Sequence, residues 1–235
     1  MNRSLDTESA NERLIGDLAG ALQPVRRLRP PNVRAVIWLA VVAAIAVVLA
    51  VFADLPAVWH RLGGAPDMWL AVTGSTLTMI LAAVAAFQLS LPDARQTWAL
   101  LPLPAALLWM VASGAGCLRT WFVPGTHVAD LGEARDCLIF ILGLAIPLSA
   151  VLFFMLRRGY SLRPELTAFA AGLASAAAAA TLLNFFHPFD AAATDLTVHL
   201  LAVAMVISAS WSLSGRLLST YFLPRDVTRA VDGSN

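Results

Sequence analysis

The most prominent pattern in this chain is a series of long apolar stretches that contain no Asp, Glu, Lys or Arg. The stretches are 19 to 25 residues long, and a helix needs roughly 20 apolar residues to cross a hydrocarbon core of about 30 Å. The strands of a membrane barrel would require a polar residue at every second position, which these stretches lack. The pattern predicts an all-α integral membrane protein, a bundle of six transmembrane helices at 35–53, 68–92, 96–118, 137–156, 166–189 and 196–215.

The arginines predict the orientation of this bundle. All 16 basic residues are Arg, and 13 of them fall in segments on the same side of the membrane as the N-terminus, against three on the other side. Because cytoplasmic segments of membrane proteins are enriched in basic residues, both termini are predicted to be cytoplasmic. The chain then divides into an amphipathic helix with an Arg-rich juxtamembrane segment (1–34), a six-helix transmembrane domain (35–215) and a cytoplasmic tail (216–235).

Residue types within the spans predict how the helices pack. The segment 170–180 consists almost entirely of Ala, Gly and Ser, and small residues let helices approach closely in a membrane, so the fifth span is predicted to be central. Pro102, Pro104 and Pro147 predict kinks in the third and fourth spans. Aromatic belts are predicted from Trp38, Trp98 and Trp211 near inner ends and from Trp59, Trp69 and Trp121 near outer ends.

Composition narrows the range of functions. With 59% hydrophobic and 13% charged residues the chain is not a disordered protein, and a net charge of +1 gives no field that would attract nucleic acid directly. The motifs G-x-S-x-G, H-E-x-x-H and G-x-x-x-x-G-K are absent, so neither an enzyme nor a required cofactor is predicted. No predicted span has a charged residue in its middle, which argues against an ion or proton path.

The N-terminal segment carries an amphipathic helical pattern. Leu14, Ile15, Leu18 and Leu22 fall on one face, and this short helix cannot bury its apolar stripe in a domain of its own. It would either lie on the membrane surface, which sequence physics alone slightly favours, or dock into a groove on a cytosolic partner. The arginines that follow are typical topology determinants and lipid-phosphate contacts; they are Arg26, Arg27 and Arg29.

Both cysteines fall on the predicted outer side, at the two ends of the loop between spans three and four. Cys117 and Cys137 share this region with His127, Glu133 and Asp136. The cysteines do not have the close spacing of a zinc site, so a structural disulfide in an oxidising compartment is the favoured interpretation. Thiols that stay reduced could instead bind a thiophilic metal ion as a signal, with His127, Glu133 or Asp136 completing the ligand set.

A second polar cluster surrounds the last outer hairpin and consists of His187, Asp190, Asp195 and His199. Asp195 and His199 are about one helical turn apart, so both could contact one cation. The two aspartates are also typical of helix ends, where a carboxylate caps free N–H groups and complements the helix dipole. This structural explanation is favoured over a second metal site.

Six short segments, taken in their order and spacing, resemble a known family. They are PVRRLRPP (24–31), WALLPLP (98–104), SGAGCLR (113–119), GE ahead of DC (132–137), MLRR (155–158) and FFHPFD (185–190). Over nearly its whole length the chain resembles the negative regulator of sigma F family, which are six-helix anti-sigma factors of the bacterial inner membrane. The resemblance implies a multi-pass protein that sequesters an extracytoplasmic-function sigma factor and releases it on envelope, heavy-metal or thiol stress.

The resemblance also implies roles for particular residues. The family ties its paired outer cysteines to sensing, with heavy metals as the associated stress, and these correspond to Cys117 and Cys137. A sigma-factor partner makes the N-terminal helix a docking peptide rather than a surface helix, with Arg157 and Arg158 as a second contact. The alternatives are a small transporter-like protein and a periplasmic thiol-redox membrane protein. The lack of mid-membrane charge counts against the first, and the lack of a Cys-X-X-Cys motif against the second.

Overall fold

The computed structural model describes residues 2–20, 28–64, 66–122, 131–159, 161–184, 200–201 and 203–212. In this part of the chain every regular element is a helix and none is a strand, as the sequence predicts. The elements are α1 (Asn2–Gly20), α2 (Pro31–Ala50), α3 (Leu55–Gly64), α4 (Pro66–Leu89), the 3₁₀ helix η1 (Gln96–Leu100), α5 (Leu103–Phe122), α6 (Leu131–Leu156), α7 (Pro164–Leu183) and a further helix at Val203–Ser212.

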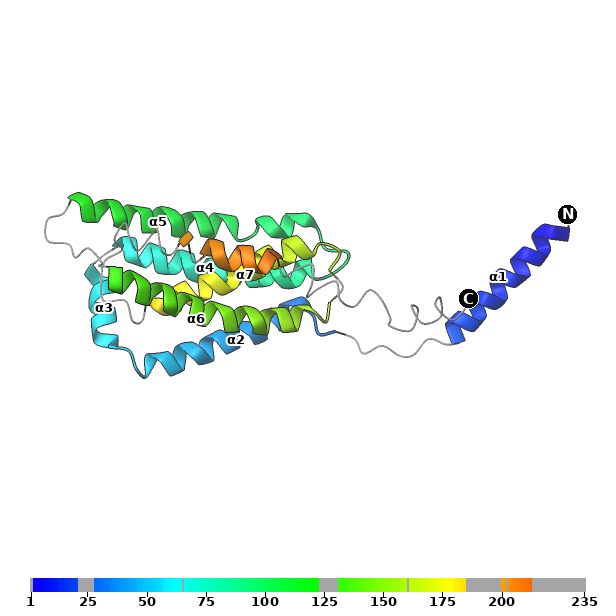
Figure 1. Ribbon diagram of the computed structural model, residues 1–235, viewed down its shortest axis with the longest axis horizontal. Coiled ribbons are helices and arrows are strands. Elements are labelled where there is room, and N and C mark those ends of the chain that lie inside the picture. The colour runs from blue at the N-terminus through cyan, green and yellow to red at the C-terminus, as the bar shows by residue number, and fades with distance from the viewer. Residues whose placement is uncertain are drawn as a thin grey trace.

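The long helices lie side by side in one elongated bundle, and α1 stands apart from it (Figure 1). Helix α4 packs against α2, α5 and α7, while α6 packs mainly against α7. Five helices are long and apolar enough to cross a membrane, and they coincide with the first five predicted spans. For the sixth predicted span, the structure describes only the apolar helix Val203–Ser212, so six spans remain a prediction.

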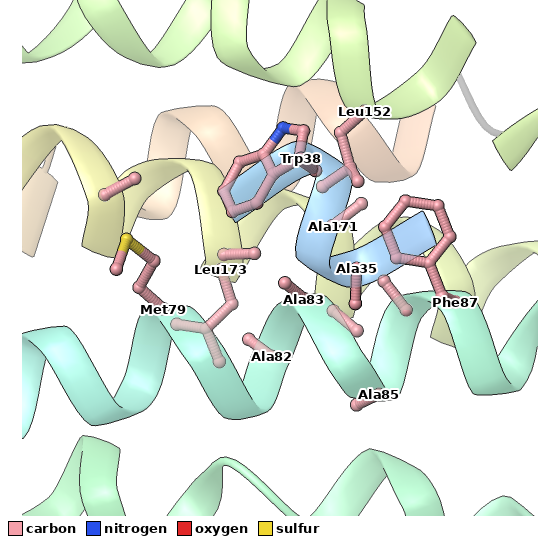
Figure 2. Close-up of a cluster of buried hydrophobic side chains, with 14 of the residues drawn as sticks. Ala35, Trp38, Met79, Ala82, Ala83, Ala85, Phe87, Leu152, Ala171 and Leu173 are labelled. Atoms are coloured by element: carbon pink, nitrogen blue, oxygen red, sulfur yellow. The ribbon is translucent and has the colours of Figure 1, made fainter. Parts of the chain in front are cut away.

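Helix α7 occupies the centre of the bundle, as its small residues predict. Fifteen of its 20 residues are buried, and its alanines contact large side chains of neighbouring helices in the main core. Figure 2 shows Trp38 of α2 between α7, where Ala171 and Leu173 lie, and Leu152 of α6. On another side, a Cβ added to Gly172 would lie 3.0 Å from the Ser210 hydroxyl and 3.1 Å from the Ile207 Cα. The helix Val203–Ser212 therefore packs closely against α7.

The two groups of prolines have different effects on their helices. In the third span η1 ends at Leu100, a turn follows at Leu101 and Pro102, and α5 begins at Leu103. The buried Pro102 accepts a hydrogen bond at its carbonyl from the Ala106 N–H, at 2.9 Å, which starts the new helix. At the predicted kink the hydrogen bonding therefore changes from 3₁₀ to α-helical within one apolar span, whereas Pro147 lies inside α6, which continues from Leu131 to Leu156.

Two further expectations need correction. No helix was predicted between the first two spans, but this connection contains α3, whose first turn is capped by the Asp54 carboxylate, which accepts a hydrogen bond from the Ala57 N–H at 3.1 Å. Trp38 does not belong to an aromatic belt: its side chain is fully buried, and its indole N–H donates to the Leu148 carbonyl at 3.2 Å. Trp59 of α3 and Trp69 at the start of α4 are exposed, and their ring centroids are 6.5 Å apart, as an aromatic belt predicts.

Candidate partner-binding and sensing sites

The apolar stripe of α1 has no partner in the described structure. Leu14, Ile15 and Leu18 are 58%, 65% and 61% exposed, which is unusual for three neighbouring large apolar side chains. Of the other residues predicted for this surface, Arg29 is exposed, whereas Leu22, Arg26 and Arg27 lie outside the described residues. The stripe is available for binding to another protein or to a membrane.

One end of the bundle brings together the start of α2, the end of α4 and the connection from α6 to α7. The Gln88 side-chain amide donates to the Asn32 side-chain Oδ1 at 3.1 Å, which joins α4 to α2. The Arg163 guanidinium donates to the Ala94 carbonyl at 3.0 Å, and the Ser161 hydroxyl donates to the Leu89 carbonyl at 3.2 Å. These contacts place three segments that carry arginines at one end of the bundle, as the predicted alternation of spans requires. We call this end, formed by residues 29–34, 88–95, 155–159 and 161–163, the arginine end.

A buried arginine, Arg34, lies at the centre of the arginine end. Its guanidinium donates to the Met155 carbonyl of α6 and to the Ser90 hydroxyl that follows α4, at 3.4 Å for the latter. It also stacks on the Phe87 ring, 4.8 Å from the centroid. The side chain is only 6% exposed. Because both acceptors lie at the C-terminal ends of helices, where the dipole is negative, the position suits a cation.

Sequence reasoning missed this role and counted Arg34 only as one of the arginines that set topology. Its hydrogen-bond partners are 56 and 121 residues away in sequence, so no local pattern identifies them. The only available signal was the position of the arginine inside the first turn of an apolar helix that begins at Pro31, where a charged side chain needs a partner or a route to water.

Arg157 and Arg158 lie at the same end and are exposed. Their guanidinium carbons lie 4.4 Å and 5.4 Å from the centroid of the Phe154 ring, which is itself 48% exposed. The chain then turns closely past α4, because a Cβ on Gly159 would lie 2.9 Å from the Ser90 carbonyl oxygen. Arg157 and Arg158 are therefore exposed directly before a backbone segment that packs closely against the end of α4.

The two cysteines fall at the opposite end of the bundle. Cys117 is in α5 and Cys137 is in α6, and the C-terminal end of α5 and the N-terminal end of α6 both point away from the arginine end (Figure 1). Asp136 is exposed on the first turns of α6. The side chains of Cys117, Glu133 and Cys137, and the whole of His127, lie outside what the structure describes, so a disulfide and a metal site both remain predictions.

The second polar cluster, His187, Asp190, Asp195 and His199, falls entirely outside the described residues. Among the residues that are described, no group of three or more His, Cys, Asp or Glu side chains is arranged to hold a metal ion. Neither metal hypothesis is tested by this observation.

Comparison with known families adds the decisive observation. The family model described as negative regulator of sigma F matches residues 18–219, which is most of the chain. The chain belongs to the negative regulator of sigma F family. The match includes Leu18 at the end of α1, the arginine end and both cysteines, while Leu14 and Ile15 precede it. No curated protein and no solved structure matches the chain.

Proposed function

We propose that this protein is a membrane-bound anti-sigma factor that sequesters an extracytoplasmic-function sigma factor at the bacterial cytoplasmic membrane and releases it under envelope, heavy-metal or thiol stress. Family membership carries the proposal, because it makes the chain a negative regulator of a sigma factor. The five long apolar helices support a membrane location. The proposed activity is regulated binding, without catalysis and without a required cofactor.

The asymmetry of the bundle supports an orientation with the arginine end in the cytoplasm. Exposed arginines gather there, namely Arg29, Arg95, Arg157 and Arg158, and basic residues mark the cytoplasmic side of membrane proteins. The exposed stripe of α1 then lies in the compartment that contains the sigma factor. The cysteines lie on the other side, where an external signal arrives.

The charge of α1 favours a protein partner over the membrane surface. Helices that lie on membranes usually carry Lys and Arg on their polar face, which attracts anionic lipids. The described polar residues of α1 include Glu12, Arg13 and Asp17, so this part of the face is acidic overall. An acidic helix is repelled by anionic lipid, and its apolar side chains fit a groove on a protein.

Capture of the sigma factor by the full-length protein in detergent tests this surface. The double variant Leu14→Asp/Leu18→Asp puts two charges on the stripe and should lower the capture affinity at least tenfold, since each buried Leu contributes roughly 1–2 kcal/mol. Gly16→Asp/Gly20→Asp is the matched control: it adds the same charge to the same helix where a new Cβ contacts nothing within 4 Å. Normal capture by the first variant would reject α1 as the docking surface.

The outer cysteines are proposed as the sensor. Occupation of Cys117 and Cys137 by a thiophilic ion, or a change in their oxidation, would alter how the ends of α5 and α6 are held. Helix α6 extends from this end to the Met155 carbonyl that binds Arg34, and Arg34 lies in the first turn of α2, close to the N-terminal segment. A signal that favours one of two arrangements of these helices by about 3 kcal/mol would change the ratio of their populations roughly a hundredfold.

Transcription from a sigma-dependent promoter, measured with and without cadmium or a thiol oxidant, tests the sensor. Cys117→Ser and Cys137→Ser should each abolish most of the induction. Met110→Leu is the control, because it removes an exposed sulfur from α5 at nearly constant volume and should leave induction normal. If both serine variants respond like the parent, the sensor lies elsewhere, and His187, Asp190, Asp195 and His199 become the next residues to replace.

A further inference from the structure

The two faces of α6 have different surroundings. Ile141, Ala145, Leu148, Leu152 and Leu156 are at most 1% exposed and face the other helices. A second apolar stripe is open, with Ile139 54%, Ile146 64%, Val151 37% and Phe154 48% exposed. In a helix that is long and apolar enough to span a membrane, such an open apolar stripe faces the lipid hydrocarbon.

The open stripe ends in an unusual arrangement of charges. Phe154 is its last apolar residue, and the guanidinium groups of Arg157 and Arg158 both lie over that ring, at 4.4 Å and 5.4 Å. The ring attracts both cations, so they lie on the lipid-facing side of α6 rather than extending into solvent. Since α6 ends at Leu156, the two groups lie where the hydrocarbon gives way to lipid headgroups.

These charges have no counter-ion in the described structure. No described carboxylate forms an ion pair with Arg157 or Arg158, and Arg34 lies nearby as a third guanidinium, bound to the Met155 carbonyl just ahead of them. Two exposed guanidinium groups that contact the same ring offer several N–H donors to an anion that reaches both. Phosphate oxygens match this planar arrangement of donors especially well.

We propose that Arg157 and Arg158, oriented by Phe154, bind the phosphate of an anionic phospholipid. This assigns them a different partner from the sigma-factor contact that the sequence predicts. The lipid acyl chains would lie along the open stripe, beside Val151 and Ile146, and the headgroup phosphate would bridge the two guanidinium groups. The site stabilises the end of α6, directly beside the Met155 carbonyl that receives Arg34.

Lipid titration of the full-length protein in a neutral detergent tests the site. Native mass spectrometry counts the bound lipid, and the rise in the thermal unfolding midpoint reports how tightly it binds. Three additives are compared: phosphatidylglycerol, phosphatidylcholine and inorganic phosphate. Of the three, only phosphatidylglycerol should bind tightly. Arg157→Gln/Arg158→Gln should weaken this binding on the order of thirtyfold, since each basic residue at a membrane surface contributes about 1 kcal/mol. Phe154→Leu retains both charges and should weaken it less.

Arg95→Gln is the matched control, because it removes an exposed arginine from the same end of the bundle and should leave lipid binding unchanged. Equal binding of phosphatidylglycerol by the double variant and the parent would overturn the proposal. So would equal effects of phosphatidylcholine, or of inorganic phosphate, which would indicate nonspecific lipid binding or a general anion site. Sigma-factor capture is measured on the same samples. A double variant that binds lipid normally but captures poorly would show that these arginines contact the protein partner instead.

Discussion

Helices α2 and α7 are both 20 residues long and both apolar enough to cross a membrane, yet they occupy opposite positions in the bundle. Helix α7 is buried along most of its length, whereas only Arg34, Ala35, Trp38 and Val42 are buried on α2. The more exposed helix is the more apolar of the two, since α2 is rich in Val, Leu and Ile while Ala is the commonest residue of α7.

The comparison shows that apolarity does not decide which helix is central in a membrane bundle. Lipid tails are as apolar as a leucine, so a large aliphatic side chain gains little by turning inward. Small side chains gain close backbone contact and dense packing, which lipids do not supply. Helix α2 is held instead by a few specific contacts near its start, where Arg34 and Trp38 donate hydrogen bonds to α6.

The sharpest test of this difference is a substitution of Trp38, the buried aromatic side chain of α2. Trp38→Ala should lower the free energy of unfolding by about 3–5 kcal/mol, because it leaves a cavity between α6 and α7. Val47→Ala on the exposed half of the same helix should change it by less than about 0.5 kcal/mol. Equilibrium unfolding by SDS in mixed micelles measures both. Similar values for the two variants would mean that α2 is attached uniformly along its length.

Arg34 provides the second test. Arg34→Met removes the charged donor from the Ser90 hydroxyl and the Met155 carbonyl, so it should destabilise the bundle by about 1.5–3 kcal/mol. Arg29→Met removes an exposed arginine just before α2 and serves as the control. The same mixed-micelle unfolding gives the values. A variant as stable as the parent would show that burying the charge costs as much as its contacts contribute.

Enlarging a small residue tests the comparison from the side of α7. Ala174 is fully buried, and Ala174→Leu should cost about 1–3 kcal/mol by forcing neighbouring helices apart. Ala44→Leu makes the same change on an exposed position of α2 and should be nearly neutral, since the new side chain extends into lipid. If Ala174→Leu were as harmless as Ala44→Leu in thermal unfolding, close packing would not explain the position of α7.

Much of the fold follows from local sequence. Charge-free stretches identify the five described spans, and the run of small residues identifies α7 as central. The helix α3 was missed although a signal existed: Asp54 followed by Leu55 and Pro56 is a typical helix start, with a capping carboxylate and a proline in the first turn.

The candidate sites also differ in how far the sequence alone predicts them. The stripe of Leu14, Ile15 and Leu18 is predictable because helical spacing alone places these residues together, and nothing in the described bundle covers them. The arrangement of Arg157 and Arg158 over Phe154 also involves neighbours in sequence, but its orientation toward lipid depends on which face of α6 the bundle covers. The sequence identifies these arginines, but the side of α6 on which they lie is known only from the packing of α6 against α7.

By itself, the sequence determined the helical class, the positions of the five helices long and apolar enough to span a membrane, the clustering of arginine and the central position of α7, because each depends on residue type or spacing within one segment. Only the tertiary structure decided the roles of Arg34 and Trp38, which the sequence placed at the membrane surface and the fold buries in the bundle. The physical reason is sequence distance. Their acceptors, Met155 and Leu148, lie 121 and 110 residues away, and only the packing of α2 against α6 brings donor and acceptor together.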